Sequence, residues 1–111
     1  MEERVLNIHE LQPSDTLRAN SQAFFRDLGL KRVKELKPLP QVWDKNGQLI
    51  ISDGNNRIGF YAQNGEKEAL VEYAVMEDND PSFGLYNEDI VSKADRLSKQ
   101  GIRTPFDLIT A

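Results

Sequence analysis

The stretch Asp53-Gly54-Asn55-Asn56-Arg57 contains residue types suited to binding an anion. It follows an apolar run that predicts a short buried strand (Leu49 to Ser52), and a predicted helix begins at Asn55. A strand that ends in a glycine turn and continues as a helix directs free backbone N–H groups and the positive end of the helix dipole outward. Arg57 lies in the first turn, where its planar guanidinium could hold a phosphate or carboxylate by two hydrogen bonds. We therefore predict an anion site at this turn.

Other interpretations of the same residues stay open at this point. Aspartate, glycine and asparagine are also the usual residues of turns and helix caps, so the stretch could be a turn without a ligand. Arg57 could form a structural salt bridge with Asp53 or Asp15. Arg18, one turn into the first predicted helix, would add a second phosphate contact if the start of that helix lined the same cleft.

Composition limits the classes of function. The chain has 111 residues, of which 39% are hydrophobic and 29% charged, as expected for one domain with a real core. Its net charge of −4 and pI of about 5.0 argue against the broad basic surface of a non-specific DNA binder. No cysteine is present and His9 is the one histidine, which excludes thiolate nucleophiles, thiolate zinc sites and His-rich metal clusters. No signal peptide or membrane-length apolar run is visible, so we expect a cytoplasmic protein that does not contact membranes.

Hydrophobic periodicity predicts a mixed α+β domain. The predicted strands cover 5–11, 40–44, 48–52 and 69–76, and Asn46-Gly47 predicts an antiparallel hairpin between the second and the third. The predicted helices cover 14–28, 55–64 and 87–99, capped by Ser14-Asp15, Asn55 and Asn87, and a short helix begins near Thr104. Gly59 inside the second helix indicates a close approach between helix and strand. The acidic stretch Glu77 to Pro81 predicts a turn or short linker.

The segment from Leu30 to Lys37 is basic, and it has two interpretations. It could form a basic lip that attracts phosphates, or it could be an ordinary solvated surface. Its cations are Lys31, Arg32, Lys34 and Lys37.

The order of these elements resembles the ParB/sulfiredoxin superfamily. Its members run strand, helix, "PLP-V" strand, Asn-Gly-like turn, strand, and a "(D/G)GxxR" turn that opens a helix ending in glycine, followed by a further "V-V-V" strand. The resemblance covers roughly Val5 to Met76. The matching pieces are Leu39-Pro40-Gln41-Val42, Asn46-Gly47, Ile50-Ile51-Ser52-Asp53-Gly54-Asn55-Asn56-Arg57, Asn64-Gly65 and Val71-Glu72-Tyr73-Ala74-Val75.

The resemblance implies a small mixed sheet with packed helices and a nucleotide phosphate site at the glycine turn. Residues 1–80 would form the ParB/sulfiredoxin-like domain, and residues 81–111 a C-terminal helical extension packed on the same single domain. Partition proteins of the family hold cytidine triphosphate, whereas sulfiredoxins and free-serine kinases hold adenine nucleotides. ATP or CTP, with Mg²⁺, is therefore the implied ligand. Gly54 would allow close backbone approach, Asn55 and Asn56 would supply N–H groups and side-chain amides, and Arg57 the charge.

Three departures from the family restrict what the resemblance implies. Sulfiredoxins need a cysteine in this loop, so sulfinic acid reductase activity is excluded. Many relatives carry histidines where this chain has Asn55-Asn56, and asparagine cannot carry a proton or a positive charge at neutral pH. The kinases use a carboxylate just after the first strand, for which Asp15 is the nearest analogue and Glu10 the other. The helix-turn-helix DNA domain of partition proteins is not expected in full at this length.

Three hypotheses follow from these residues. The first is a regulatory module that binds a nucleoside triphosphate at Asp53–Arg57. The second is a small ATP- or ADP-dependent phosphotransferase or nucleotide hydrolase, with Asp15 or Asp53 as base or Mg²⁺ ligand and Arg57 neutralising charge. The third is a DNA-associated or protein-interaction domain of ParB-like nuclease type whose loop is vestigial. Each names a different partner, namely a nucleotide, a phosphorylated substrate, and DNA or another protein.

Overall fold

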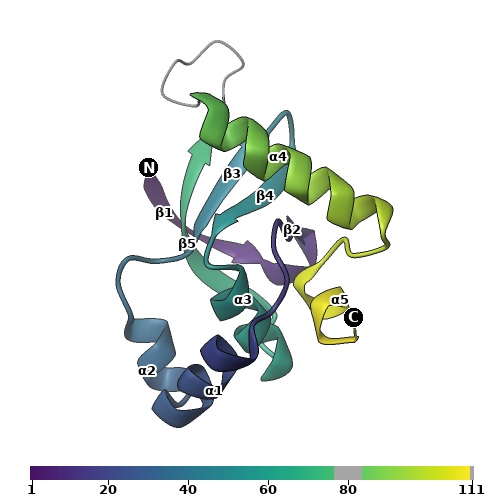
Figure 1. The fold of residues 1–111 in the computed structure, drawn as a ribbon. Coiled ribbons are helices and arrows are strands. Elements are labelled where there is room, and N and C mark those ends of the chain that lie inside the picture. Colours follow the sequence, from purple (N-terminus) through teal and green to yellow (C-terminus); the bar gives the residue numbers. More distant parts are fainter. Residues whose placement is uncertain (77–83, 111) are drawn as a thin grey trace.

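The computed structural model describes residues 1–76 and 84–110 and shows one mixed sheet with helices on both faces (Figure 1). This architecture confirms the predicted α+β class, whereas a specifically ParB/sulfiredoxin-like fold stays a prediction. The predicted linker at Glu77 to Pro81 lies outside the described residues. The elements are β1 (Glu2–Asn7), the 3-10 helix η1 (Ile8–Glu10), β2 (Leu11–Gln12), α1 (Ala19–Leu28), α2 (Leu30–Glu35), β3 (Gln41–Lys45), β4 (Gln48–Asp53), α3 (Asn55–Gln63), β5 (Glu68–Val75), α4 (Gly84–Lys99) and α5 (Pro105–Thr110).

The sheet has the strand order β1-β5-β3-β4-β2. The β3–β4 pair is antiparallel and is joined at Asn46 and Gly47, which both have positive φ, so the predicted Asn-Gly hairpin is confirmed. The first strand differs from its prediction over 5–11. Asn7 Oδ1 accepts a hydrogen bond from the His9 N–H and caps η1, which ends β1. The chain then crosses to the opposite edge of the sheet, where β2 runs parallel to β4.

Two helix starts also differ from their predictions. α1 begins at Ala19 rather than at Ser14, and the residues Ser14–Arg18 form an irregular segment that we call the strap. The Ser14 side chain does not cap a helix because it bonds to the end of β4 and the start of α3 instead. α4 begins at Gly84, so Asn87 lies inside the helix and not at its cap.

The two faces of the sheet are covered by different helices. Val42 and Ile51 pair across β3 and β4 and belong to the core cluster that includes the apolar face of α3. Since side chains alternate along a strand, the neighbouring Ile50 points to the other face, where it packs against Ile90 and Ala94 of α4. The sheet edge at the end of β4 is thus held between α3 and α4.

The C-terminal residues pack on the N-terminal ones. The rings of His9 in η1 and Phe106 in α5 are stacked with centroids 4.2 Å apart. The Gln12 Nε2 donates to the Ile102 carbonyl at 2.8 Å, and α5 lies against α3. Among the described residues, no helix is long and apolar enough to cross a membrane.

Candidate functional site

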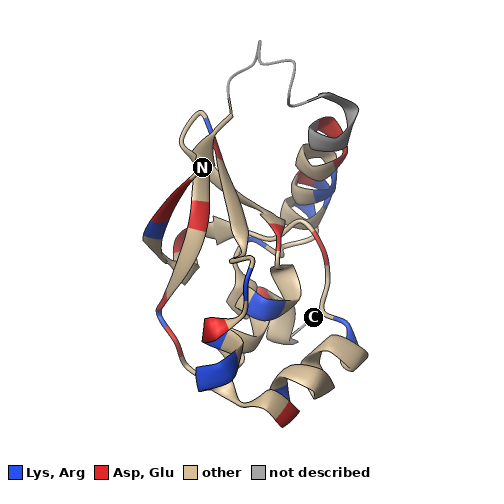
Figure 2. Cartoon of the chain, turned by 90° about the vertical axis from the view of Figure 1, so that its left-hand side faces the viewer, with Lys and Arg blue, Asp and Glu red and all other residues tan. Residues whose placement is uncertain are grey.

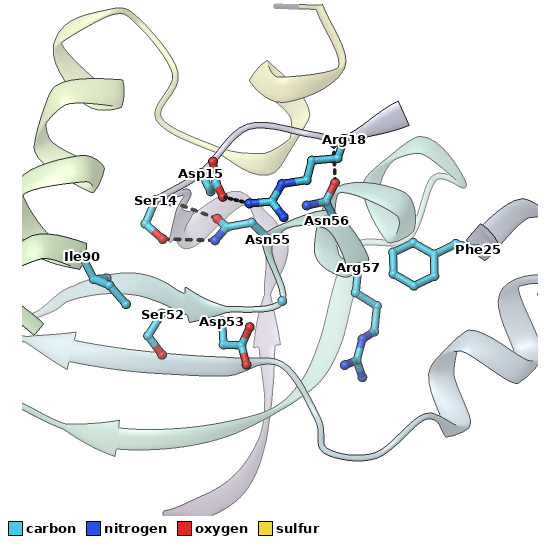
Figure 3. A pocket seen from close by; sticks show the side chains of 11 residues that line it. Ser14, Asp15, Arg18, Phe25, Ser52, Asp53, Asn55, Asn56, Arg57 and Ile90 are labelled. Carbon is cyan, nitrogen blue, oxygen red and sulfur yellow. Dashed lines mark hydrogen bonds and ion pairs between the residues drawn. The ribbon is translucent and has the colours of Figure 1, made fainter. Parts of the chain in front are cut away.

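A cavity of about 300 Å³ opens where β4 turns into α3 (Figure 3). All of the candidate site residues predicted from the sequence line it, including Asp15 and Arg18 from the strap. Four residues that the sequence did not point to complete it. The lining consists of Ser14, Asp15, Arg18, Phe25, Ser52, Asp53, Gly54, Asn55, Asn56, Arg57 and Ile90.

Gly54 shapes the turn between β4 and α3. It has φ 87° and ψ 23°, the left-handed conformation that favours glycine. A Cβ at this position would lie 2.8 Å from the Cβ of Pro40, so a larger residue would also clash. The turn therefore brings the backbone of β4 directly into the first turn of α3.

The N-terminus of α3 has no side-chain cap. Gly54 is the N-cap residue and offers no side chain, and the first helical bond runs from the Ile58 N–H to the Gly54 carbonyl at 3.0 Å. The N–H groups of Asn55, Asn56 and Arg57 therefore have no acceptor within the helix. Together with the helix dipole they form a donor set for an anion.

The Asn55 side chain fastens the strap and is not available to a ligand. Its Oδ1 accepts from the Ser14 N–H at 2.9 Å, and its Nδ2 donates to the Ser14 Oγ at 3.0 Å. The Ser14 hydroxyl in turn donates to the Ile51 carbonyl at 2.5 Å. Asn55 and Ser14 are both buried, so these bonds are shielded from water. At Asn55 only the backbone N–H faces the predicted anion site.

Asn56 holds the other end of the strap. Its Oδ1 accepts from the Arg18 N–H at 2.6 Å, and its carbonyl accepts from the Gln22 Nε2 at 2.8 Å (Figure 3). Within the part of the chain that the structure describes, its Nδ2 makes no hydrogen bond. Between these two anchors the Leu17 side chain lies against Gly59, where a Cβ would come within 2.3 Å of its Cδ2. The close approach predicted at Gly59 is therefore made by the strap, not by a strand.

Arg57 extends away from Arg18 along the cavity wall, toward the loop after α2 (Figure 3). Its Nη1 donates to the Leu36 carbonyl at 3.1 Å. Burial raises the pKa of Tyr61, and the positive charge of Arg57 and its hydrogen bond partly oppose that rise. Among residues 1–76 and 84–110, Arg57 makes no salt bridge with Asp53 or Asp15. The guanidinium is thus oriented by neutral groups and keeps its full charge for a ligand.

The charged groups of the cavity balance each other. Asp15 pairs with Arg18 at 3.3 Å, and their side chains are 47% and 71% exposed, so the pair contributes about 0–1 kcal/mol and exchanges easily. The Asp53 carboxylate makes no ion pair or side-chain hydrogen bond within the described residues. Two carboxylates and two arginines therefore give the empty cavity no net formal charge.

Several other sequence candidates lie away from the cavity. Glu10 belongs to η1, and none of the basic residues of 30–37 is among the lining residues. Lys34 pairs with Glu66, and Lys37 with Glu3 at 3.5 Å, as expected for a solvated surface. Within the described parts of the chain, no group of three or more His, Cys, Asp or Glu residues is placed to hold a metal ion.

The lining residues that sequence reasoning missed come from distant segments. Ser14 and Ser52 had local interpretations, as a helix cap and a strand end, whereas Phe25 and Ile90 appeared as members of apolar helix stripes. No local signal marks them, because their place in the cavity depends on how α1 and α4 dock.

Comparisons of the chain with family models, curated proteins and solved structures found no match. The site is therefore argued from its own geometry.

Proposed function

We propose that the chain is a ParB-like nucleotide-binding module that holds the phosphates of a nucleoside triphosphate, ATP or CTP, at the N-terminus of α3. The observation that carries the proposal is the uncapped first turn of α3, which opens into a cavity of about 300 Å³ that also contains Arg18 and Arg57. That volume lies at the lower end of the range for small-molecule sites. The resemblance of Asp53–Arg57 to the phosphate loop of the ParB/sulfiredoxin superfamily supports the choice of ligand.

The backbone makes the central contacts in this proposal. The N–H groups of Asn55, Asn56 and Arg57 donate to phosphate oxygens, and Gly54 lets the phosphate approach the chain closely. The exposed Arg18 guanidinium leaves Asp15 for the ligand, because a phosphate offers it more negative charge than one carboxylate. Arg57 contributes its charge from the opposite wall.

Mg²⁺ fits the carboxylates of the same cavity. Mg²⁺ is usually bound by one or two carboxylates together with substrate phosphates and waters. Asp53, which lacks a partner within the described residues, would hold the ion, and Asp15 would join it once Arg18 has turned to the phosphate. The ion would neutralise phosphate charge, while the residues of the chain position the nucleotide.

The unpaired Asp53 carboxylate also favours a second candidate function, a small phosphotransferase or nucleotide hydrolase. A carboxylate next to bound phosphate can hold Mg²⁺ or orient a nucleophile. Asp15, the predicted catalytic residue, is the weaker choice because Arg18 occupies it. Binding of DNA is not part of the proposal, because acidic and basic residues are interspersed on the side of the molecule shown in Figure 2.

The test is a thermal-shift series with ATP, CTP and inorganic phosphate, each with and without Mg²⁺. A ligand at 100 times its Kd adds about 2.7 kcal/mol to the unfolding free energy, which gives a clear rise in Tm. We expect Arg57→Ala to abolish the rise and Arg18→Ala to weaken binding roughly 10-fold or more, since charge-assisted hydrogen bonds contribute about 1.5–3 kcal/mol. Arg26→Ala, an exposed arginine at the other end of α1, is the matched control and leaves binding unchanged.

Two results would overturn the proposal. One is the absence of any shift with every nucleotide and with phosphate. The other is a shift that neither Arg18→Ala nor Arg57→Ala reduces. Turnover separates the two candidate functions: a phosphotransferase or hydrolase releases product and loses this activity in Asp53→Asn, whereas a binding module releases none.

A further inference from the structure

β1 is an edge strand whose outer side is open. It pairs with β5 on one side only, and no described strand lies on the other. The Ile8 N–H donates to the Lys67 carbonyl, so the even-numbered residues of β1 face β5 in the hydrogen-bonded pairs of this antiparallel ladder. The N–H and C=O groups of Glu3, Val5 and Asn7 consequently point away from the sheet. They form a ready template for another strand.

An apolar pair lies beside this edge. Val5 and Leu70 are direct cross-strand partners and are 59% and 42% exposed. Leu70 and Ala74 share a face of β5, and the pairing of Ala74 with Trp43 places them on the side of the sheet where α4 lies. α4 crosses the sheet near β4 and leaves β1 uncovered (Figure 1). Exposed apolar side chains next to an open edge favour a strand partner over solvent.

We propose that β1 pairs with β1 of a second copy of the chain, antiparallel, with Val5 opposite Val5 at the two-fold axis. This register places Glu3 of each copy opposite Asn7 of the other. It uses all the outward backbone groups of the strand, because Glu3, Val5 and Asn7 then all fall in hydrogen-bonded pairs. The two apolar pairs of Val5 and Leu70 become one continuous stripe, and the two sheets become one.

Charge selects this register and a second copy as the occupant. The Asn7 Oδ1 accepts from the His9 N–H, so its Nδ2 is left to donate to the Glu3 carboxylate of the other copy. A register centred on Arg4 would instead place two arginines opposite each other, which is unfavourable. Because Glu3 complements Asn7 within one strand, the edge is complementary to itself, as a two-fold interface requires.

The pairing is independent of the nucleotide site, which lies at the opposite edge of the sheet from β1. A single short strand buries a small area, so the association falls among weak interfaces. Sedimentation equilibrium of the chain, with no tag at its N-terminus, should show a monomer–dimer equilibrium between about 10 µM and 1 mM. The exchange of the Val5 amide hydrogen should slow as the protein concentration rises, because the amide is bonded only in the dimer.

Val5→Lys tests the interface without disturbing the core, since the side chain is largely exposed. A charged lysine on an edge strand opposes pairing, and we expect at least a 10-fold weaker dimer. Phe24→Lys, an exposed apolar residue on α1, is the matched control and leaves the dimer unchanged. A monomer throughout the concentration range overturns the proposal, and so does a dimer that Val5→Lys does not weaken. Protection of the Val5 amide that is independent of concentration would also contradict it.

Discussion

Replacing Asn55 with alanine should destabilise the fold through the strap rather than through the anion site. The Asn55 side chain accepts from the Ser14 N–H and donates to the Ser14 Oγ, and both residues are buried. Alanine removes both bonds and leaves the Ser14 N–H without an acceptor. The backbone N–H of residue 55 stays in place, so the proposed phosphate contacts are preserved.

The magnitude follows from the burial of these groups. Each lost hydrogen bond contributes about 0.5–1.5 kcal/mol, and a buried N–H left without a partner costs about 1–3 kcal/mol. Since these terms partly overlap, we expect Asn55→Ala to lower the unfolding free energy by about 2–4 kcal/mol. In a domain of this size that lowers Tm by about 8–16 °C.

Asn56→Ala is the internal comparison. The Asn56 Oδ1 accepts one hydrogen bond, from the exposed Arg18 N–H, and water can replace it. We expect a loss of about 0.5–1 kcal/mol for this variant. Urea unfolding followed by circular dichroism gives both values. Equal losses in the two variants, or a loss below about 1 kcal/mol for Asn55→Ala, would refute the role assigned to the buried anchor of the strap.

Two further outcomes test the packing around α3. Gly59→Ala should cost stability in the native chain, because its Cβ would meet Leu17 at 2.3 Å, but should add about 0.5–1 kcal/mol in a Leu17→Ala background through helix propensity; a double-mutant cycle by urea unfolding that shows simple additivity would contradict this contact. The raised pKa of Tyr61, caused first by burial, adds stability that is fully present below pH 10 and is lost as the pH rises through the folded-state pKa. The unfolding free energy of Tyr61→Phe should therefore fall less steeply above pH 10 than that of the native chain, and equal slopes would exclude this contribution.

The parts of the fold that the sequence predicted well are those specified by neighbouring residues. The Asn46-Gly47 hairpin, α3 and β5 all follow from turn chemistry and periodicity within about ten residues. The glycine turn into α3 belongs to the same group. Gly54 has the predicted turn geometry, and the requirement for glycine is local except for its contact with Pro40.

The parts that could not be predicted depend on contacts between distant segments. Ser14 followed by Asp15 has the composition of a helix cap, and nothing nearby shows that Asn55, 41 residues further on, binds Ser14 instead. The break between β1 and β2 is similar. The apolar residues of 5–11 suit one strand, but Asn7 caps a 3-10 turn and the chain continues at the opposite edge of the sheet.

The strap changes the chemistry that the asparagines of the loop can provide. Because Asn55 spends its side chain on Ser14 and Asn56 spends its oxygen on Arg18, the donors that remain at the turn are mainly backbone N–H groups. Backbone amides bind charge but do not transfer protons at neutral pH, so a reaction at this site would have to use a carboxylate. Asp53 is the carboxylate that lies in the cavity without a partner among the described residues. Binding therefore depends on the amides and arginines, whereas any turnover would depend on Asp53, and substitutions separate the two.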